Sequence, residues 1–164
     1  MSKIKNIIIH CSQSSFGDAM WIKNIHINEN GWRDIGYNGV ILNGAREKGN
    51  YNTNNIGRFE MGRGLDLNET IDSNERGAHA LGYNEESLGL CLIGDKKFYI
   101  KQFQTALYFC ALFMAIIPDI KIFGHYELNE NKTCPNFDMK QFRGLLKNRD
   151  FIDDEIKMVM EKYL

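Results

Sequence analysis

The sequence lacks an excess of charge of either sign and any long apolar run. It has 20 Lys and Arg residues against 21 Asp and Glu residues, so its formal net charge of −1 provides no general attraction for nucleic acid or anionic membranes. The longest apolar run, residues 111–117, is far too short to span a bilayer. We therefore expect no nucleic-acid partner and no membrane partner.

The sequence also lacks the features of an exported protein. The apolar stretch near the start covers only residues 7–9, whereas a signal peptide needs a longer one. The four cysteines are widely scattered in or beside apolar runs, which argues against a disulfide framework. We therefore expect synthesis in the cytoplasm without a signal peptide, and cysteines present as free thiols.

The residues that are present suit one globular domain over residues 1–164. At 43% hydrophobic residues, the chain has enough apolar material to form a core. The hydrophobic patterns predict strands and helices in the order β, α, β, β, β, α, β, α. These elements fall at residues 4–11, 19–30, 37–42, 56–61, 87–94, 101–117, 121–124 and 138–147. The predicted fold class is α/β, with a single mixed sheet covered by helices.

Two further segments lie outside these elements. Residues 43–55 are rich in Gly and Asn and too long for a tight hairpin, so we expect a loop involved in specificity or mobility. Residues 148–164 form a C-terminal tail that can be helical. Its apolar stripe, which we expect to pack on the domain, consists of Ile152, Ile156, Val159 and Tyr163.

Three side chains suggest a metal site. His10 and His125 each stand where a predicted strand gives way to a loop, and Cys134 lies in the loop after His125. A thiolate and two imidazoles are good zinc ligands, and three protein ligands leave a fourth position open, as in catalytic sites. Spacing alone is weak evidence, because such histidines and cysteines are more often structural. Cys11 competes with Cys134, although His10 and Cys11 should point to opposite faces of a strand.

Several sequence blocks, in order, carry a resemblance to a known family. They are IIHCS at 8–12, DIGYN at 34–38, EMGRG at 60–64, GAHALGYN at 77–84, SLGLCLIG at 87–94, GHYE at 124–127 and KTCP at 132–135. Together they resemble the type 2 N-acetylmuramoyl-L-alanine amidases, which include phage lysozyme-type amidases and animal peptidoglycan recognition proteins. The resemblance runs from about residue 7 to residue 146, and it implies an amidase-like fold.

The resemblance also implies roles for individual residues. The zinc (Zn2+) ligands of the family correspond to His10, His125 and Cys134. Its catalytic tyrosine and lysine correspond to Tyr37 and Lys132. Substrate-contacting positions correspond to His79, Asn84 and Arg63, although His79 could instead hold a ligand in place. Asn38 replaces a histidine found in many phage members, but recognition proteins commonly have asparagine there. His26 also resembles a histidine of the family, but we interpret it as a structural histidine on the first predicted helix.

These residues imply hydrolysis of the amide between the lactyl group of N-acetylmuramic acid and L-alanine in peptidoglycan. Zinc would polarise the lactyl carbonyl and activate water, Lys132 would stabilise the oxyanion, and Tyr37 would position the water or the intermediate. Glu127 is the acid nearest to His125 in sequence. We expect it to accept a ligand N–H, or alternatively to act as a base.

The sequence is compatible with other functions. A non-catalytic module that binds peptidoglycan or muramyl peptides commonly lacks the third ligand, whereas Cys134 is present here. Some phage amidases also inhibit RNA polymerase through a surface that includes an N-terminal extension, but only nine residues precede His10, so we do not expect that partner. Between a cytoplasmic enzyme that recycles wall fragments and a phage endolysin released to the wall, we favour the endolysin.

Overall fold

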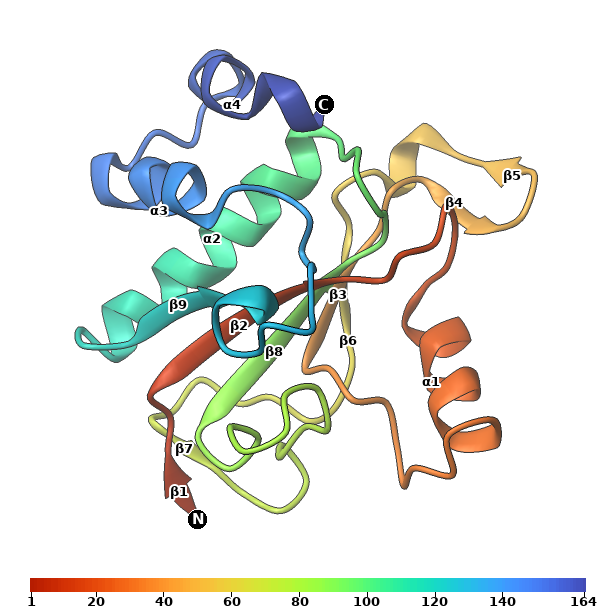
Figure 1. Ribbon diagram of the computed structural model, residues 1–164, viewed down its shortest axis with the longest axis vertical. Helices are drawn as coiled ribbons and strands as arrows, with labels where there is room; N and C mark the ends of the chain where they lie inside the picture. The colour runs from red at the N-terminus through yellow and green to blue at the C-terminus, as the bar shows by residue number, and fades with distance from the viewer.

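A five-stranded mixed sheet forms the centre of the molecule in a computed structural model that describes residues 1–164 (Figure 1). The strand order is β6-β3-β8-β2-β9, and only the β3–β6 pair is antiparallel. The strands are β2 (Asn6–Cys11), β3 (Gly39–Ile41), β6 (Phe59–Met61), β8 (Ser87–Leu92) and β9 (Lys121–Gly124). The predicted mixed sheet is confirmed.

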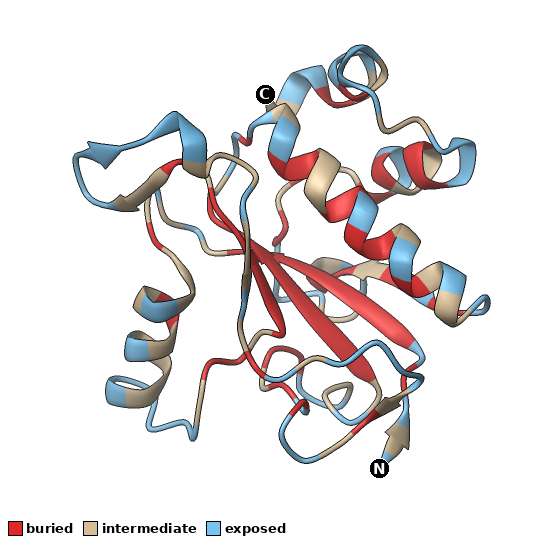
Figure 2. Cartoon of the chain, turned by 180° about the vertical axis from the view of Figure 1, so that it is seen from behind, coloured by how far each residue is buried: buried red, intermediate tan, exposed pale blue.

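Helices cover both faces of this sheet, which is why its central strands are buried along their whole length (Figure 2). Helices α2 (Ile100–Ile116), α3 (Met139–Asn148) and α4 (Asp153–Met160) lie on one side, and α1 (Ala19–Asn28) lies on the other. Every residue of β2 and β8 is buried. None of the helices is long and apolar enough to cross a membrane.

The alternation of side chains along β2 assigns its residues to two separate environments. Ile7, Ile9 and Cys11 belong to the large core that includes α2, α3 and α4. His10 therefore points to the opposite face, where a smaller cluster joins α1 to the sheet. That cluster consists of Ile22, Ile35, Val40, Leu42, Cys91 and Ile93. His10 emerges at the carboxyl end of a central strand, on the α1 side.

Two of the helices begin at an aspartate cap. The carboxylate of Asp18 accepts the N–H of Trp21 at the start of α1, and that of Asp138 accepts the N–H groups of Lys140 and Gln141 at the start of α3. Helix α1 ends at Asn28, two residues earlier than the pattern predicted.

The segment predicted as a plain loop over residues 43–55 contains regular structure. Strands β4 (Ala45–Glu47) and β5 (Asn50–Tyr51) form a hairpin, followed by a short 3-10 helix η1 (Thr53–Asn55). Arg46 joins this hairpin to the body through ion pairs with Asp18 and Glu60. A second small sheet, also unpredicted, pairs β1 (Ser2–Lys3) with β7 (Thr70–Ile71).

The C-terminal tail packs on the domain as expected, with one exception. Ile156 and Met160 of α4 are completely buried against the main core, and Val159 and Tyr163 pack beside them. Tyr163 lies in a last 3-10 turn, η3 (Glu161–Tyr163). Ile152 was predicted to belong to the same stripe, but it is 61% exposed. The reason is that Ile152 precedes the first turn of α4 and so does not share its buried face.

We expect Ile156→Ala to lower the free energy of unfolding by about 2–5 kcal/mol, because it leaves a cavity in a core that includes α2. Ile152→Ala is the matched control and should change it by less than about 0.5 kcal/mol. Chemical denaturation of both variants measures the difference. Equal effects at the two positions would show that the tail does not contribute to the core.

Candidate metal centre

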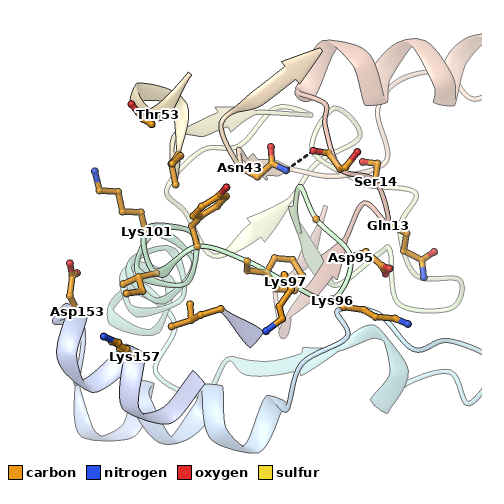
Figure 3. A pocket seen from close by; sticks show the side chains of 17 residues that line it. Gln13, Ser14, Asn43, Thr53, Asp95, Lys96, Lys97, Lys101, Asp153 and Lys157 are labelled. Carbon is orange, nitrogen blue, oxygen red and sulfur yellow. Dashed lines mark hydrogen bonds between the residues drawn. The ribbon is translucent and has the colours of Figure 1, made fainter. Parts of the chain in front are cut away.

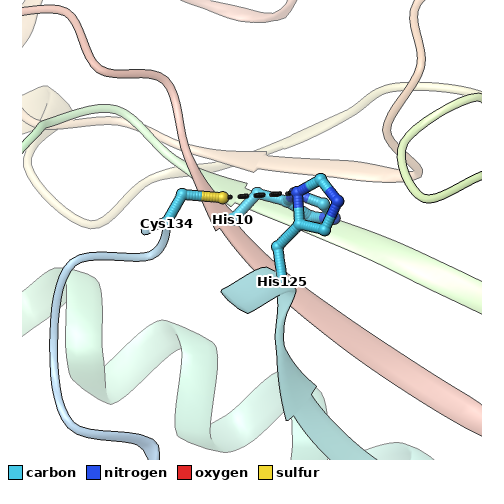
Figure 4. A group of neighbouring side chains, drawn as sticks. All are labelled: His10, His125 and Cys134. Carbon is cyan, nitrogen blue, oxygen red and sulfur yellow. Dashed lines mark hydrogen bonds between the residues drawn. The ribbon is translucent and has the colours of Figure 1, made fainter. Parts of the chain in front are cut away.

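Three segments distant in sequence bring together the imidazoles of His10 and His125 and the thiol of Cys134 (Figure 4). His10 is near the end of β2, His125 directly follows the neighbouring strand β9, and Cys134 lies in the loop beyond. The N–H of Tyr126 donates to the carbonyl of Cys134 and so brings this loop back beside His125. One ligand atom from each residue lies within 4.8 Å of the other two, and all three residues are buried.

The spacing of these atoms fits a tetrahedral zinc ion. The Cys134 Sγ atom is 3.6 Å from His10 Nδ1 and 3.5 Å from His125 Nδ1. Zinc bonds of about 2.3 Å to sulfur and 2.0–2.1 Å to nitrogen, at a tetrahedral angle, place the two ligand atoms about 3.6 Å apart. Both sulfur–nitrogen distances therefore suit a zinc ion.

The protonation states of the ligands also suit a metal. The pKa of the Cys134 thiol is strongly lowered, first by a hydrogen bond from Cys11 and then by bonds to His10 and His125. Burial lowers the pKa of His10 below its ordinary value of 6.5. At neutral pH the site therefore offers a thiolate and a neutral imidazole. Cys11 stays a thiol, since the hydrogen bond to Cys134 and burial raise its pKa, and it lies outside the ligand group.

His79 holds the other side of the His10 ring. His10 Nε2 is 3.0 Å from His79 Nδ1, and His79 Nε2 is 3.4 Å from the Ser87 carbonyl oxygen. If His10 Nδ1 binds the metal, its Nε2–H donates to His79 Nδ1, and His79 then donates through Nε2. These contacts support the role of His79 in holding a ligand. A direct contact of His79 with substrate stays a prediction.

Two glycines make room for the His79 ring. A Cβ atom on Gly77 would lie 2.5 Å from His79 Cδ2, and one on Gly89 would lie 2.6 Å from the same atom. Both glycines belong to sequence blocks that carry the family resemblance. The packing of the His79 ring behind His10 therefore requires glycine at both positions.

Tyr37 lies beside the metal group, at the entrance to β3. Its ring centroid is 5.1 Å from that of His10. Burial raises the pKa of its phenol well above the ordinary value of 10.0, so the hydroxyl stays a hydrogen-bond donor. His26 packs against Tyr37 at 5.6 Å between ring centroids and accepts the N–H of Gly36. The hydrogen bond supports the interpretation of His26 as a structural histidine, and it holds the backbone just before Tyr37.

The remaining predicted site residues differ in their surroundings. Lys132 is exposed, and its charge contributes to the lowered pKa of His10, after burial. The Asn84 side-chain oxygen accepts the N–H groups of His79 and Ala80, and so shapes the His79 loop. Arg63 is buried. Its guanidinium donates to the backbone carbonyls of residues 34, 35 and 76. These contacts support positioning roles for Asn84 and Arg63, and their contact with substrate stays a prediction.

The structure corrects the expectation for Glu127. Its carboxylate accepts the N–H of Gly124 at 2.8 Å and two N–H groups of Arg143 at 2.7 and 2.9 Å. It forms no hydrogen bond with a ligand imidazole. Because both of its oxygens are engaged by Arg143, Glu127 stabilises the turn that carries His125.

Sequence reasoning gave no structural role to Asn38, which connects three segments around the site. Its side chain donates to the Glu75 carbonyl at 2.7 Å and accepts the N–H of Gly89 at 2.9 Å. The residue is fully buried, so these bonds form away from water. Only its place after Tyr37 in the DIGYN block could have signalled this role.

Comparison with known proteins decides the family. The model of the N-acetylmuramoyl-L-alanine amidase family matches residues 1–137. The chain belongs to this amidase family. It is 29% identical over 146 residues to the endolysin of Escherichia phage T7, with 83% of each chain covered.

Solved structures of amidases and recognition proteins share the fold. The N-acetylmuramoyl-L-alanine amidase LysC from Clostridium intestinale URNW matches with a TM-score of 0.70 at 20% identity, over 89% of this chain and 87% of that one. A mutant of Drosophila PGRP-LB, in complex with tracheal cytotoxin, matches with a TM-score of 0.63 at 25% identity, over 82% and 76%. The expected amidase and recognition-protein fold is therefore confirmed.

We expect Gly89→Ala to weaken divalent metal binding by about 10- to 100-fold, because the new Cβ atom displaces the His79 ring that orients His10. The matched control is Gly144→Ala on α3, where a Cβ atom meets nothing within 4 Å. That variant should bind metal normally and gain up to about 1 kcal/mol of stability. Competition with a metallochromic chelator measures the affinity. Unchanged affinity in Gly89→Ala would mean that His79 does not orient the ligand.

Proposed function

We propose that this protein is a zinc-dependent amidase that hydrolyses the bond between N-acetylmuramic acid and the L-alanine of peptidoglycan. The observation that carries the proposal is the group of His10, His125 and Cys134, whose sulfur–nitrogen distances suit zinc and which includes a thiol with a strongly lowered pKa. Family membership supports the reaction, and the three-ligand set supports the metal. A zinc ion held there would polarise the amide carbonyl and lower the pKa of water toward about 7.

Tyr37 is positioned to donate a hydrogen bond during the reaction. Its hydroxyl stays protonated at neutral pH, and its ring is held between His10 and His26. Such a donor can orient the attacking water or the developing oxyanion, and can relay a proton to the leaving amine.

Lys132 supplies a positive charge on the open side of the ligand loop. It stands two residues before Cys134 and is exposed, whereas the ligands are buried. An ammonium group in this place is suited to stabilise negative charge that develops on the carbonyl oxygen. It forms no ion pair within the protein, so its charge is available to substrate.

The relatives support a role in wall lysis. The T7 relative and the endolysins of Enterobacteria phage T3 and Klebsiella phage KP32 cover 83% of this chain. We therefore propose that the protein is a phage endolysin that acts on the cell wall. A recognition module without catalysis is the alternative, but the complete ligand group favours the enzyme. Digestion of wall fragments tests the choice.

We expect one zinc ion per chain, lost on chelation, and cleavage that releases stem peptides beginning with L-alanine from intact glycan strands. Cys134→Ser should lose both zinc and activity, because a serine hydroxyl is a poor zinc ligand. Cys110→Ala removes a buried thiol on α2 and should retain both. Metal analysis and mass spectrometry of digested peptidoglycan measure the outcomes. New reducing sugar ends would show a glycosidase and contradict the proposal.

We expect Lys132→Ala and Tyr37→Phe to keep zinc and peptidoglycan binding but to lower kcat and kcat/KM together by about 100-fold or more. The reason is that each group is proposed to act on the transition state and not on the metal. Lys147→Ala and Tyr108→Phe, at exposed positions on α3 and α2, are matched controls. If Lys132→Ala lost zinc instead, Lys132 would be a structural support of the ligand loop.

A further inference from the structure

Cys11 is a buried thiol that the proposed reaction does not use, and it lies beside the sulfur of Cys134. Both residues belong to the main core, at 5% and 8% exposure, and a hydrogen bond joins their side chains. The Cys134 sulfur is also 3.6 Å from the ring of His10, the residue before Cys11 in sequence. The two sulfur atoms are therefore in contact where the loop that carries Cys134 meets the end of β2.

A chain of hydrogen bonds orients the Cys11 thiol. The side-chain nitrogen of Asn136, two residues after Cys134, donates to the Cys11 sulfur at 3.6 Å and to the Asp95 carboxylate at 2.7 Å. Asp95 belongs to the loop after β8 and lines a cleft of about 1080 Å³ (Figure 3). Because the Cys11 sulfur accepts the bond from Asn136, its single proton is free to point to Cys134.

The other two cysteines lack such a partner. Cys91 is fully buried, and its sulfur donates to the carbonyl of Leu92 at 3.8 Å. Cys110 is fully buried within α2. Neither forms a hydrogen bond with another sulfur. Cys11 and Cys134 are therefore the one pair of cysteines with a direct contact between their sulfurs.

The two sulfurs of this pair have different reactivity. The lowered pKa of Cys134 makes it the thiolate, and the raised pKa of Cys11 keeps it a thiol. A thiolate is the form of cysteine that a hydroperoxide oxidises, and a neighbouring thiol converts the resulting sulfenic acid to a disulfide. A disulfide needs its sulfurs about 2.05 Å apart, so a pair already in contact has only a short distance to close.

We propose that Cys11 and Cys134 form a reversible redox pair, in which a hydroperoxide converts the ligand thiolate to an intramolecular disulfide. The inference rests on the proposed function, in which Cys134 is a zinc ligand. The Cys134 thiolate attacks the O–O bond and keeps one oxygen as a sulfenic acid, while the alkoxide or hydroxide that leaves takes a proton from water. The Cys11 sulfur then attacks the Cys134 sulfur, and the Cys11 proton leaves with the hydroxyl group as water. Two electrons pass from the pair to the peroxide.

The disulfide would remove the only thiolate of the metal group. His10 and His125 would remain, and two imidazoles are fewer ligands than catalytic zinc sites have. The oxidised chain should therefore lose its metal, and reduction by a dithiol should restore the site. In the other direction, a bound zinc ion occupies the Cys134 sulfur and should protect it from oxidation.

The test treats the metal-free wild-type chain with hydrogen peroxide and maps its peptides by mass spectrometry. We expect a cross-link between Cys11 and Cys134 within one chain, and zinc binding, measured with a metallochromic chelator, that falls in proportion to it. Dithiothreitol should reverse both changes. Zinc at about 100 times its Kd leaves about 1% of the sites free, so it should slow the cross-linking about 100-fold.

A variant without the second thiol separates the redox pair from simple oxidation of Cys134. In Cys11→Ala, peroxide should carry Cys134 on to the sulfinic acid, and dithiothreitol should not restore zinc binding. Cys110→Ala is the matched control and should behave like the wild type.

Three results would overturn the inference: no cross-link in the wild type, a cross-link to Cys91 instead, or full recovery of zinc binding in oxidised Cys11→Ala. A cross-link that left zinc binding intact would overturn the inference and the assignment of Cys134 as a ligand together. Failure of the amidase reaction alone is distinguishable, because the masses and the metal binding are measured without substrate.

Discussion

The two ring nitrogens of His10 have different partners, and the arrangement of the whole site depends on this. One nitrogen lies beside Cys134 and His125, and the other is hydrogen-bonded to His79. A buried imidazole whose two nitrogens are both occupied has a single orientation and a single tautomer. Gly89 on the adjacent strand leaves space for the His79 ring, so the sheet itself determines how the ligand points.

Parallel pairing of the central strands explains why the ligands meet. β2 has β8 on one side and β9 on the other, both parallel to it, so the carboxyl ends of all three lie at one edge. His10 is close to that edge, and His125 directly follows β9. Alternation along β2 sends His10 toward α1 and Cys11 into the main core. Cys134, arriving from a loop, contacts both faces and takes a hydrogen bond from Cys11 as well.

The extent to which sequence predicted this structure depends on the range of the interactions involved. Strand β2 and the caps Asp18 and Asp138 could be predicted, because they depend on local pattern and chemistry. The hairpin within residues 43–55 could not, because its polar residues resemble a loop and Arg46 joins it to distant carboxylates. The hydrogen bonds of Arg63 could not be predicted either, because its partners are backbone carbonyls that only the folded chain brings together.

The ligand group itself was only partly visible in the sequence. Strand ends placed two histidines at one edge, but the pairing of Cys134 with them required the family resemblance, because loop closure between residues 126 and 134 has no local pattern. Glu127 is a second example, in which proximity in sequence was misleading. Its nearness in sequence to His125 suggested a chemical role, whereas its carboxylate reaches Arg143, sixteen positions later on α3.

The site divides its charges between a buried part and an exposed part, and each part has a different task. In the buried part, the thiolate of Cys134 provides a single negative charge, so a divalent cation would leave the centre positive and attractive to a carbonyl oxygen. In the exposed part, lysine side chains at the rim lie in solvent, where salt screens their charge. Lys132 stands where the two parts meet. Its charge is close enough to lower the pKa of His10, yet its ammonium group remains in solvent, where a substrate can reach it.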